Sequence, residues 1–324
     1  MRFALIMTVK NEADALPRLF ETLALQTKQP DEIIVADGGS TDDTVKLLRA
    51  AAEHLHLRVL ECPGANISQG RNAAIAATDA DIIASMDAGT RLDAHWFEKL
   101  TAPFSQNNAP DVVSGFFLPD PHGAFETALA ATTLPLRRDI RPETFLPSSR
   151  SIAFRRAAWQ KINGYPEWLD YCEDLIFDFD LQRAGFRFHF QPDALVYFRP
   201  RPTLGKFFRQ YYLYARGDGK ADLWLKRHLI RYATYLVALP FSFLVFPFAP
   251  LLSAVMWLGA IVALFGTPYR RLRILWKNLS PAQKLRALVY VPIIRIAGDV
   301  AKMIGYPVGI VWRMQHRARS AQNA

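Results

Sequence analysis

Apolar and polar residues alternate over the first 198 residues in two different periods. Short apolar runs rich in β-branched residues predict five strands, and the segments between them carry apolar residues at helical spacing. Because strands and helices follow one another in turn, we expect an α/β fold with a mostly parallel sheet and helices on both faces. The predicted strands are residues 3–9, 32–36, 57–60, 81–86 and 112–117, and the predicted helices are residues 13–25, 42–55, 68–78 and 93–104.

The pattern weakens over residues 119–147, where Pro and Gly are scattered. We interpret this stretch as an active-site flap or an acceptor loop. Further along, the apolar spacing predicts helices over residues 152–159 and 173–184 and short strands over residues 186–190 and 195–198.

A long uncharged segment follows, with 38 residues between Arg231 and Arg270. As a helix it would measure roughly 57 Å, about twice the hydrocarbon core of a membrane. Pro247 and Pro250 would break such a helix, so we predict a hairpin with arms over residues 232–246 and 251–267. Basic residues flank both ends, which predicts that both ends lie in the cytoplasm. A re-entrant hairpin and a buried pair of helices are the alternatives.

Residues 288–312 are also apolar, but Arg295, Asp299 and Lys302 fall on one helix face. This spacing favours an amphipathic helix that lies in the membrane interface or packs against the hairpin. We therefore expect two domains, a catalytic α/β domain over residues 1–225 and membrane-associated helices over residues 226–324.

Charge is divided unevenly along the chain. The net charge is +9, but from Arg199 onward there are 20 Lys and Arg against three Asp, whereas the first 198 residues have a net charge of −8. A polyanionic surface is expected to face the basic part. Since the uncharged segment suits lipid, we expect an anionic membrane and not nucleic acid. The two cysteines suit a reducing compartment, and no signal-peptide pattern is seen, so the first domain is expected on the cytoplasmic side of a bacterial inner membrane.

Acidic residues stand where predicted strands end. Asp37 ends the second strand and is followed by two glycines and a Ser/Thr/Asp cluster, Thr8 and Glu12 end the first strand, and Asp87 ends the fourth. Open α/β sheets bind nucleotides at such ends. Asp37 is therefore placed to accept a hydrogen bond from a base or a ribose hydroxyl, and Asp87 is placed to hold a divalent cation on a diphosphate. Arg71, near a helix start, is placed to face a phosphate. An ordinary strand–turn–helix junction, a surface arginine and a helix-initiating acid are the alternatives.

Two further segments carry candidate chemistry. Glu173-Asp174 begins a helix, where acids often only compensate the helix dipole, but one of them is placed to be the general base for an acceptor hydroxyl. The aromatic and basic segment with Arg209, Gln210 and Arg216 is either a clamp over a diphosphate leaving group or a juxtamembrane helix.

As an ordered set, these motifs resemble an inverting family 2 glycosyltransferase with a GT-A fold, over roughly residues 2–220. Within that family, the chain is most similar to membrane-associated enzymes of bacterial exopolysaccharide synthesis of the succinoglycan type, where an Arg-Gln-Tyr segment likewise precedes a hydrophobic C-terminus. The resemblance implies that Asp87 binds a metal ion. It also implies that Asp174, beside Glu173, is the catalytic base. It also implies a nucleotide-sugar site made of Thr8, Val9, Asn11, Glu12, Asp37, Gly39, Arg71, Asp87, Arg209, Gln210 and Arg216.

One motif departs from the family. The usual metal motif is Asp-x-Asp, and here it is Asp87-Ala-Gly89, whose glycine has no side-chain ligand. A requirement for Mg²⁺ or Mn²⁺ is therefore an expectation that depends on Asp87.

The resemblance implies transfer of a sugar from a nucleotide-diphosphate sugar, first of all a UDP-sugar, to a hydroxyl of a lipid-linked or polysaccharide acceptor in cell-envelope synthesis. Transfer to polyprenyl phosphate and a non-catalytic sugar-nucleotide binding protein in the membrane are the alternatives.

Overall fold

The computed structural model describes residues 1–322, with side chains described as far as residue 316. The chain divides into two compact units. The first contains Met1–Asp120 and Leu136–Arg199, and the second contains Pro121–Pro135 and the chain from Pro200 onward. The units part at residue 199, and the expected functional boundary at residue 225 stays a prediction.

One sheet of eight strands forms the centre of the first unit, in the order β3-β2-β1-β4-β7-β6-β8-β5. Neighbours from β3 to β4 are parallel, as are β6 and β8, whereas β7 and β5 pair antiparallel with their neighbours. The sheet is thus mixed, and all five strands predicted in the first part of the chain are present. The strands are β1 Phe3–Val9, β2 Glu32–Asp37, β3 Leu57–Glu61, β4 Ile82–Asp87, β5 Thr90–Leu92, β6 Val112–Pro119, β7 Ile152–Arg155 and β8 Phe188–Phe198.

Two predictions in the second half of this unit are wrong. Residues 152–155 are a strand and not the start of a helix, because Ile152, Ala153 and Phe154 are all buried between β4 and β6. A strand buried on both faces does not alternate, so its apolar run cannot be told from a buried helix by period alone. The two short strands predicted at 186–190 and 195–198 are one strand, β8.

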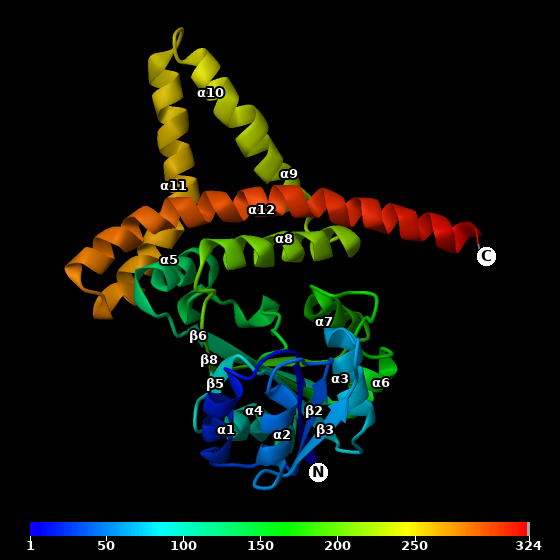
Figure 1. Cartoon of the computed structure of the whole chain (residues 1–324). Coiled ribbons are helices and arrows are strands. Elements are labelled where there is room, and N and C mark those ends of the chain that lie inside the picture. Colours follow the sequence, from blue (N-terminus) through cyan, green and yellow to red (C-terminus); the bar gives the residue numbers. More distant parts are fainter. Residues whose placement is uncertain (323–324) are drawn as a thin grey trace. The chain divides into compact units, whose positions relative to one another are not determined.

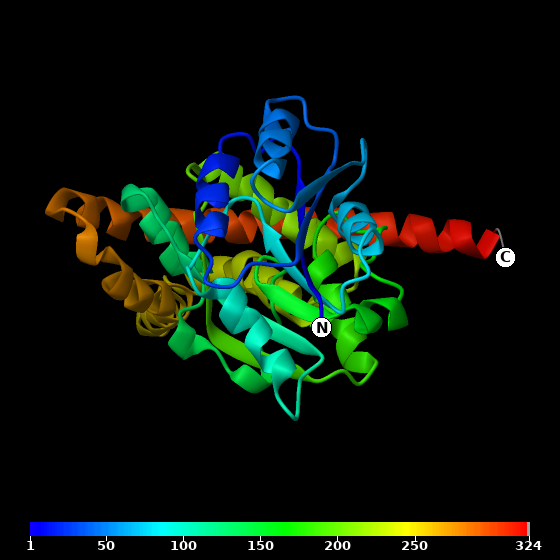
Figure 2. The ribbon, with the colours of Figure 1, turned by 90° about the horizontal axis from the view of Figure 1, so that it is seen from below.

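Helices cover both faces of the sheet, as predicted. One apolar cluster joins the sheet to α1 (Leu16–Ala24), α2 (Thr44–Ala52) and α4 (Trp96–Thr101). A second cluster joins the other face to α3, α6 and α7. In Figure 2, α1 (dark blue) and α3 (light blue) lie on opposite sides of the parallel strands. The helices of the second face are α3 Ile67–Ala76, α6 Arg156–Lys161 and α7 Glu173–Arg183.

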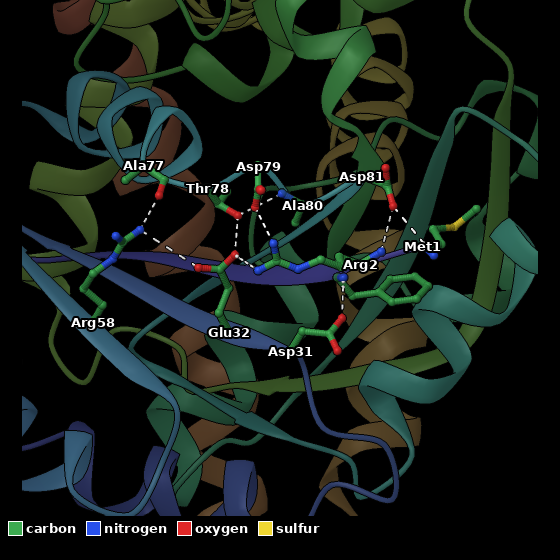
Figure 3. A network of polar contacts seen from close by, with 11 residues as sticks. Met1, Arg2, Asp31, Glu32, Arg58, Ala77, Thr78, Asp79, Ala80 and Asp81 are labelled. Carbon is green, nitrogen blue, oxygen red and sulfur yellow. Dashed lines mark hydrogen bonds and ion pairs between the residues drawn. The ribbon is translucent and has the colours of Figure 1, made fainter.

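A polar network connects the amino ends of the parallel strands (Figure 3). The Arg2 guanidinium contacts Asp79 at 2.5 Å and Glu32 at 3.2 Å, and the backbone N–H of Arg2 donates to Asp81 at 2.7 Å. Exposed ion pairs of this kind contribute little free energy each. Their geometry nevertheless joins β1, β2 and the segment before β4, in the register that brings the opposite, carboxyl ends of these strands together.

The second unit is helical. Residues 123–133, inside the predicted flap, form a helix, so that part of the loop prediction is wrong. The residues from Glu126 to Ala131 are all buried, which explains why no single apolar face was visible in the sequence. The helices of the unit are α5 Gly123–Thr133, α8 Leu204–Lys220, α9 Leu225–Tyr232, α10 Leu239–Val245, α11 Pro250–Leu275 and α12 Pro281–Gln322, with a π-helical segment at Ala233–Ala238 between α9 and α10.

The predicted hairpin is present as two helical arms joined by a turn after Val245 (Figure 1). Leu225–Val245 and Pro250–Asn278 are each long and apolar enough to cross a membrane. Only 11% and 6% of their most apolar windows are buried inside the protein. The alternative of a buried helical pair therefore does not describe these arms, whose apolar side chains face outward.

Helix α12 is longer than predicted and runs along α8 (Figure 1). The charged face identified in the sequence packs inside the unit: Asp299 accepts from Arg231 of α9 at 2.7 Å and from Arg295 at 2.9 Å. Burial lowers the pKa of Lys302 to about 8. Another face of α12 leaves a row of large apolar residues exposed: Leu285, Val289, Ile293, Ile296, Val300, Ile304, Val308 and Val311.

Candidate active site

The carboxyl ends of three parallel strands bring the predicted acids together. Val9 is the register partner of Asp37 on β2, and Thr8 is the partner of Asp87 on β4. Asp37 and Asp87 therefore flank the end of β1 from its two sides, as expected for ligand sites at the carboxyl edge of such a sheet.

The loops after β1 and β2 are held together by hydrogen bonds. The Asp37 carboxylate accepts from the backbone N–H groups of Gly39 at 2.9 Å and Ser40 at 3.0 Å, which closes the turn. Gly39 has a φ of +88°, a conformation that favours glycine. Asn11 accepts from the backbone N–H of Thr41 at 2.8 Å. Asp37 thus orders its own turn.

Glu12 belongs to the same pair of loops. Its backbone N–H donates to the Thr44 hydroxyl at 2.8 Å, which ties the end of the first loop to the start of α2. The binding roles predicted for Thr8, Val9, Asn11, Glu12, Asp37 and Gly39 stay predictions.

Helix α3 approaches β1 very closely at its first turn. Asn66 and Gln69 form a reciprocal capping box, each side chain accepting from the other's backbone N–H at 2.9 Å. A Cβ on Gly70 would come within 2.8 Å of the Thr8 side chain, so a larger residue there would force Thr8 or the helix to shift. The next residue, Arg71, therefore points into the site from a fixed backbone.

Arg71 is buried and does not lie on the surface. Its guanidinium contacts Glu173 Oε1 at 2.6 Å and Asp87 Oδ1 at 3.4 Å. It therefore joins the end of β4 to the start of α7, across 102 residues of sequence. Because its nitrogens are engaged with two carboxylates, Arg71 orients the acids, and the phosphate contact predicted for it stays a prediction.

Glu173 and Asp174 differ in their surroundings. Glu173 is buried beside Arg71, and burial raises its pKa to about 7 although that guanidinium opposes the shift. Asp174 is only partly buried. Burial also raises its pKa, against the opposing charges of Arg71 and Arg150. An accessible carboxylate with a raised pKa has the properties of a general base at neutral pH.

Sequence reasoning missed two residues at this site. Arg150 reaches Asp87 Oδ2 with Nε at 3.5 Å, from the loop before β7. Asn72 accepts from Trp159 Nε1 at 3.0 Å and from the backbone N–H of Tyr165 at 2.9 Å, and so fixes the loop before α7 on α3. Both residues come from polar stretches, Ser-Ser-Arg-Ser and Gln-Gly-Arg-Asn, whose spacing carries no signal for either contact.

The side chains around Asp87 do not fit a divalent cation. Both carboxylate oxygens face guanidinium groups, and Gly89 supplies no second carboxylate. Among residues 1–316 no group of three His, Cys, Asp or Glu side chains is arranged to hold a metal ion. Mg²⁺ and Mn²⁺ are held by carboxylate oxygens, and here both oxygens of Asp87 already face positive charges that would repel the cation.

The three candidates on α8 belong to the second unit. Gln210 donates to the Tyr214 hydroxyl at 2.8 Å within that helix. The leaving-group roles of Arg209, Gln210 and Arg216 stay predictions.

Comparison with known proteins identifies the class. The mannosyltransferase PcManGT from Pyrobaculum calidifontis, solved in complex with GDP-Man and Mn²⁺, has a similar fold. The TM-score is 0.56 at 17% identity, over 93% of this chain and 87% of that one. Together with the mixed sheet and its acidic carboxyl edge, this likeness shows a GT-A glycosyltransferase fold.

The sequence comparison gives the family. Residues 4–161 match the model of glycosyl transferase family 2. The chain is 26% identical to the succinoglycan biosynthesis protein ExoA of Rhizobium meliloti, over 79% of this chain and 80% of ExoA. It is also 26% identical to the O-antigen chain rhamnosyltransferase RfbN of Salmonella typhimurium, over 65% and 71% of the two chains. The protein is a glycosyltransferase, and residues 4–161 belong to family 2.

Proposed function

We propose that this glycosyltransferase transfers a sugar from a nucleotide-diphosphate sugar to a hydroxyl of a lipid-linked or polysaccharide acceptor. The transfer inverts the configuration at the anomeric carbon. The observation that carries the proposal is the Arg71 bridge. It holds the acid pair of α7 beside Asp87, at the sheet edge where the nucleotide is expected. The names of ExoA and RfbN support a place in the synthesis of a cell-envelope polysaccharide.

The donor would lie along the carboxyl ends of β1, β2 and β4. The loops ordered by Asp37 and Asn11 would receive the nucleoside, and a UDP-sugar is the first donor to test. The diphosphate would then extend toward Asp87 and Arg150. This placement is supported by the strand register, which puts Asp37 and Asp87 on opposite sides of β1.

Asp174 would act as the general base. It takes the proton of the acceptor hydroxyl while that oxygen attacks the anomeric carbon from the face opposite the nucleotide. The bond from the anomeric carbon to the β-phosphate oxygen breaks, and the nucleoside diphosphate leaves with the electron pair. Partial exposure favours Asp174 over Glu173, whose carboxylate is paired with Arg71.

The second unit would hold the enzyme at the cytoplasmic face of the bacterial inner membrane. Two exposed apolar arms and a net charge of +17 from Arg199 onward support an anionic lipid surface as the partner. An acceptor carried on a lipid would thereby be supplied close to the enzyme.

The test is transfer of label. Membranes containing the full chain are incubated with labelled UDP-, GDP- and dTDP-sugars, with chelator or with Mg²⁺ or Mn²⁺, and the lipid and polymer fractions are counted. We expect label in one of these fractions and an equal amount of nucleoside diphosphate released, and neither in membranes containing the Asp174→Asn variant. If no sugar nucleotide is consumed under any metal or lipid condition, the proposal fails.

A further inference from the structure

The Asp87 carboxylate lies between two guanidinium groups. Arg71 approaches Oδ1 at 3.4 Å, and Arg150 approaches Oδ2 at 3.5 Å. Both arginines stay protonated at any pH that a protein tolerates. A divalent cation bound by Asp87 would thus stand beside two fixed positive charges, and the other carboxyl group that contacts them, Glu173, lies on Arg71.

Arg71 and Arg150 have different freedom to bind a further anion. Arg71 is committed to Glu173 at 2.6 Å as well as to Asp87. Arg150 is held mainly by aromatic faces, since its guanidinium lies 4.3 Å from the ring centroid of Phe198 and 5.1 Å from that of Phe117. Its buried Nε faces Asp87 Oδ2 at 3.5 Å and makes no hydrogen bond with the described residues. The guanidinium of Arg150 is thus positioned by the two rings and by Asp87, while its terminal nitrogens, which make no hydrogen bond with the described residues, are left for an oxyanion.

The motif around Asp87 agrees with this arrangement. The second carboxylate of an Asp-x-Asp motif is replaced by Gly89, and no atom lies within 4 Å of the place that a Cβ on this glycine would take. Space for a second acidic side chain exists, but this sequence does not use it. Positive charge comes instead from the protein, on the loop before β7.

We propose that Arg150 takes the charge-balancing role of a divalent cation, so that the donor diphosphate is bound by its guanidinium and transfer needs no metal. Asp87 and Arg71 keep Arg150 and Glu173 in place. A planar guanidinium matches two phosphate oxygens at once, and its charge offsets the negative charge that develops on the leaving diphosphate. This inference rests on the proposed function, because it names the group that binds the same donor.

The experiment separates nucleotide binding from turnover. Binding of UDP, GDP and dTDP to the full chain in detergent is measured by calorimetry, once with EDTA and once with Mn²⁺. The variants are Arg150→Gln, the double variant Gly89→Asp with Arg150→Gln, and Arg155→Gln. Arg155 is the matched control, because it too pairs with an aspartate, Asp111 at 3.4 Å, and lies over an aromatic ring, that of Phe104.

We expect one of the three nucleotides to bind the wild type with the same Kd, within about twofold, in EDTA and in Mn²⁺. Arg150→Gln should weaken binding by about tenfold or more in EDTA, as for the loss of a charged hydrogen bond. Arg155→Gln should bind like the wild type. The double variant should regain affinity only when Mn²⁺ is present, because the carboxylate introduced at position 89 then forms an acidic pair with Asp87.

Nucleotide binding that requires Mn²⁺ in the wild type would overturn the proposal, as would Arg150→Gln binding as tightly as wild type in EDTA. Absence of binding under all conditions would overturn it too. A wild type that binds as expected but transfers no sugar would instead contradict the proposed function. As a control for folding, Arg150→Gln and Arg155→Gln should both unfold at temperatures close to that of the wild type.

Discussion

Asp174 and Glu173 are neighbours in sequence, yet they differ in burial and in the groups that they contact. Glu173 is buried and paired with Arg71. Asp174 is partly exposed, and its carboxylate accepts a hydrogen bond from the backbone N–H of Leu175 at 2.9 Å. The acid pair was visible in the sequence. Which of the two carboxyl groups can reach an acceptor depends on how far each is buried. Glu173 is buried in contact with Arg71, a residue that is distant in the sequence.

Replacing Asp174 by Asn should lower transfer to a hydroxyl acceptor by about 10²–10⁴-fold, because the proposed general base is lost. Nucleotide binding, measured by calorimetry, should change by less than about threefold. Asp180→Asn on the same helix is the control and should transfer sugar like the wild type. Substantial residual activity of Asp174→Asn would instead favour a phosphate acceptor, which needs no base.

Glu173 makes the stability of the protein depend on pH. Its folded pKa of about 7 lies above the ordinary value of 4.5, so the folded chain keeps a proton that the unfolded chain loses. The free energy of unfolding should therefore fall as pH rises from about 4.5 to 7, by on the order of 3 kcal/mol, and level off above 7. Glu173→Gln cannot titrate, and its unfolding should lack this fall.

The measurement is thermal unfolding of both proteins in detergent at intervals from pH 4.5 to 8. The temperature difference between wild type and Glu173→Gln should change across the window and stay constant above it. Parallel curves over the whole range would contradict a raised pKa for this carboxyl.

Helices α8 and α12 form the closest helix pair of the second unit. A Cβ on Gly305 would collide with the backbone oxygen of Tyr212, and one on Gly309 with that of Arg216. Glycines three and four residues apart on one helix face allow such backbone contact between helices. The close approach of the partner helix explains why glycine stands at these two positions.

Replacing Gly305 by Leu should push the two helices apart and lower the unfolding free energy by about 1–3 kcal/mol, the usual cost of overpacking. Gly259→Leu on α11 is the matched control, since no atom lies within 4 Å of its Cβ position. Both are compared by thermal unfolding in detergent. Equal unfolding temperatures would contradict tight packing of α8 on α12.

Taken whole, the chain joins an α/β catalytic unit to an apolar helical hairpin. The break between the arms falls beside Pro247 and Pro250, where the sequence predicted it, and Trp257 of α11 donates to Ser242 of α10 at 2.8 Å across the turn. Basic residues lie before α10 and after the apolar part of α11. By the positive-inside rule, both ends of the hairpin should be cytoplasmic.

A reporter fused after Thr267 tests this topology. A reporter active only in the cytoplasm should give signal there, and so should one fused after Arg231. A fusion after Phe248, at the turn, distinguishes the two kinds of hairpin: exposure outside the cytoplasm indicates full crossing, and a cytoplasmic signal indicates a re-entrant loop. A periplasmic signal after Thr267 would contradict the hairpin.

The sequence by itself determined the alternation of strands and helices, the acids at strand ends and the uncharged hairpin. Each of these follows from local rules, namely side-chain period, turn residues and length against membrane thickness. For the same reason, the doubly buried strand β7 and the all-round buried helix α5 were missed, because burial on every side removes the period.

Only the tertiary structure decided which charges meet. Residues 71, 87, 150 and 173 come from four separate segments. The distances between their side chains depend on the strand order β1-β4-β7 and on the close packing of α3 against Thr8. Ion pairs between residues as far apart as 71 and 173 leave no trace in local spacing. The acids of this glycosyltransferase could therefore be predicted one by one, whereas Arg150 and the buried position of Arg71 required the folded chain.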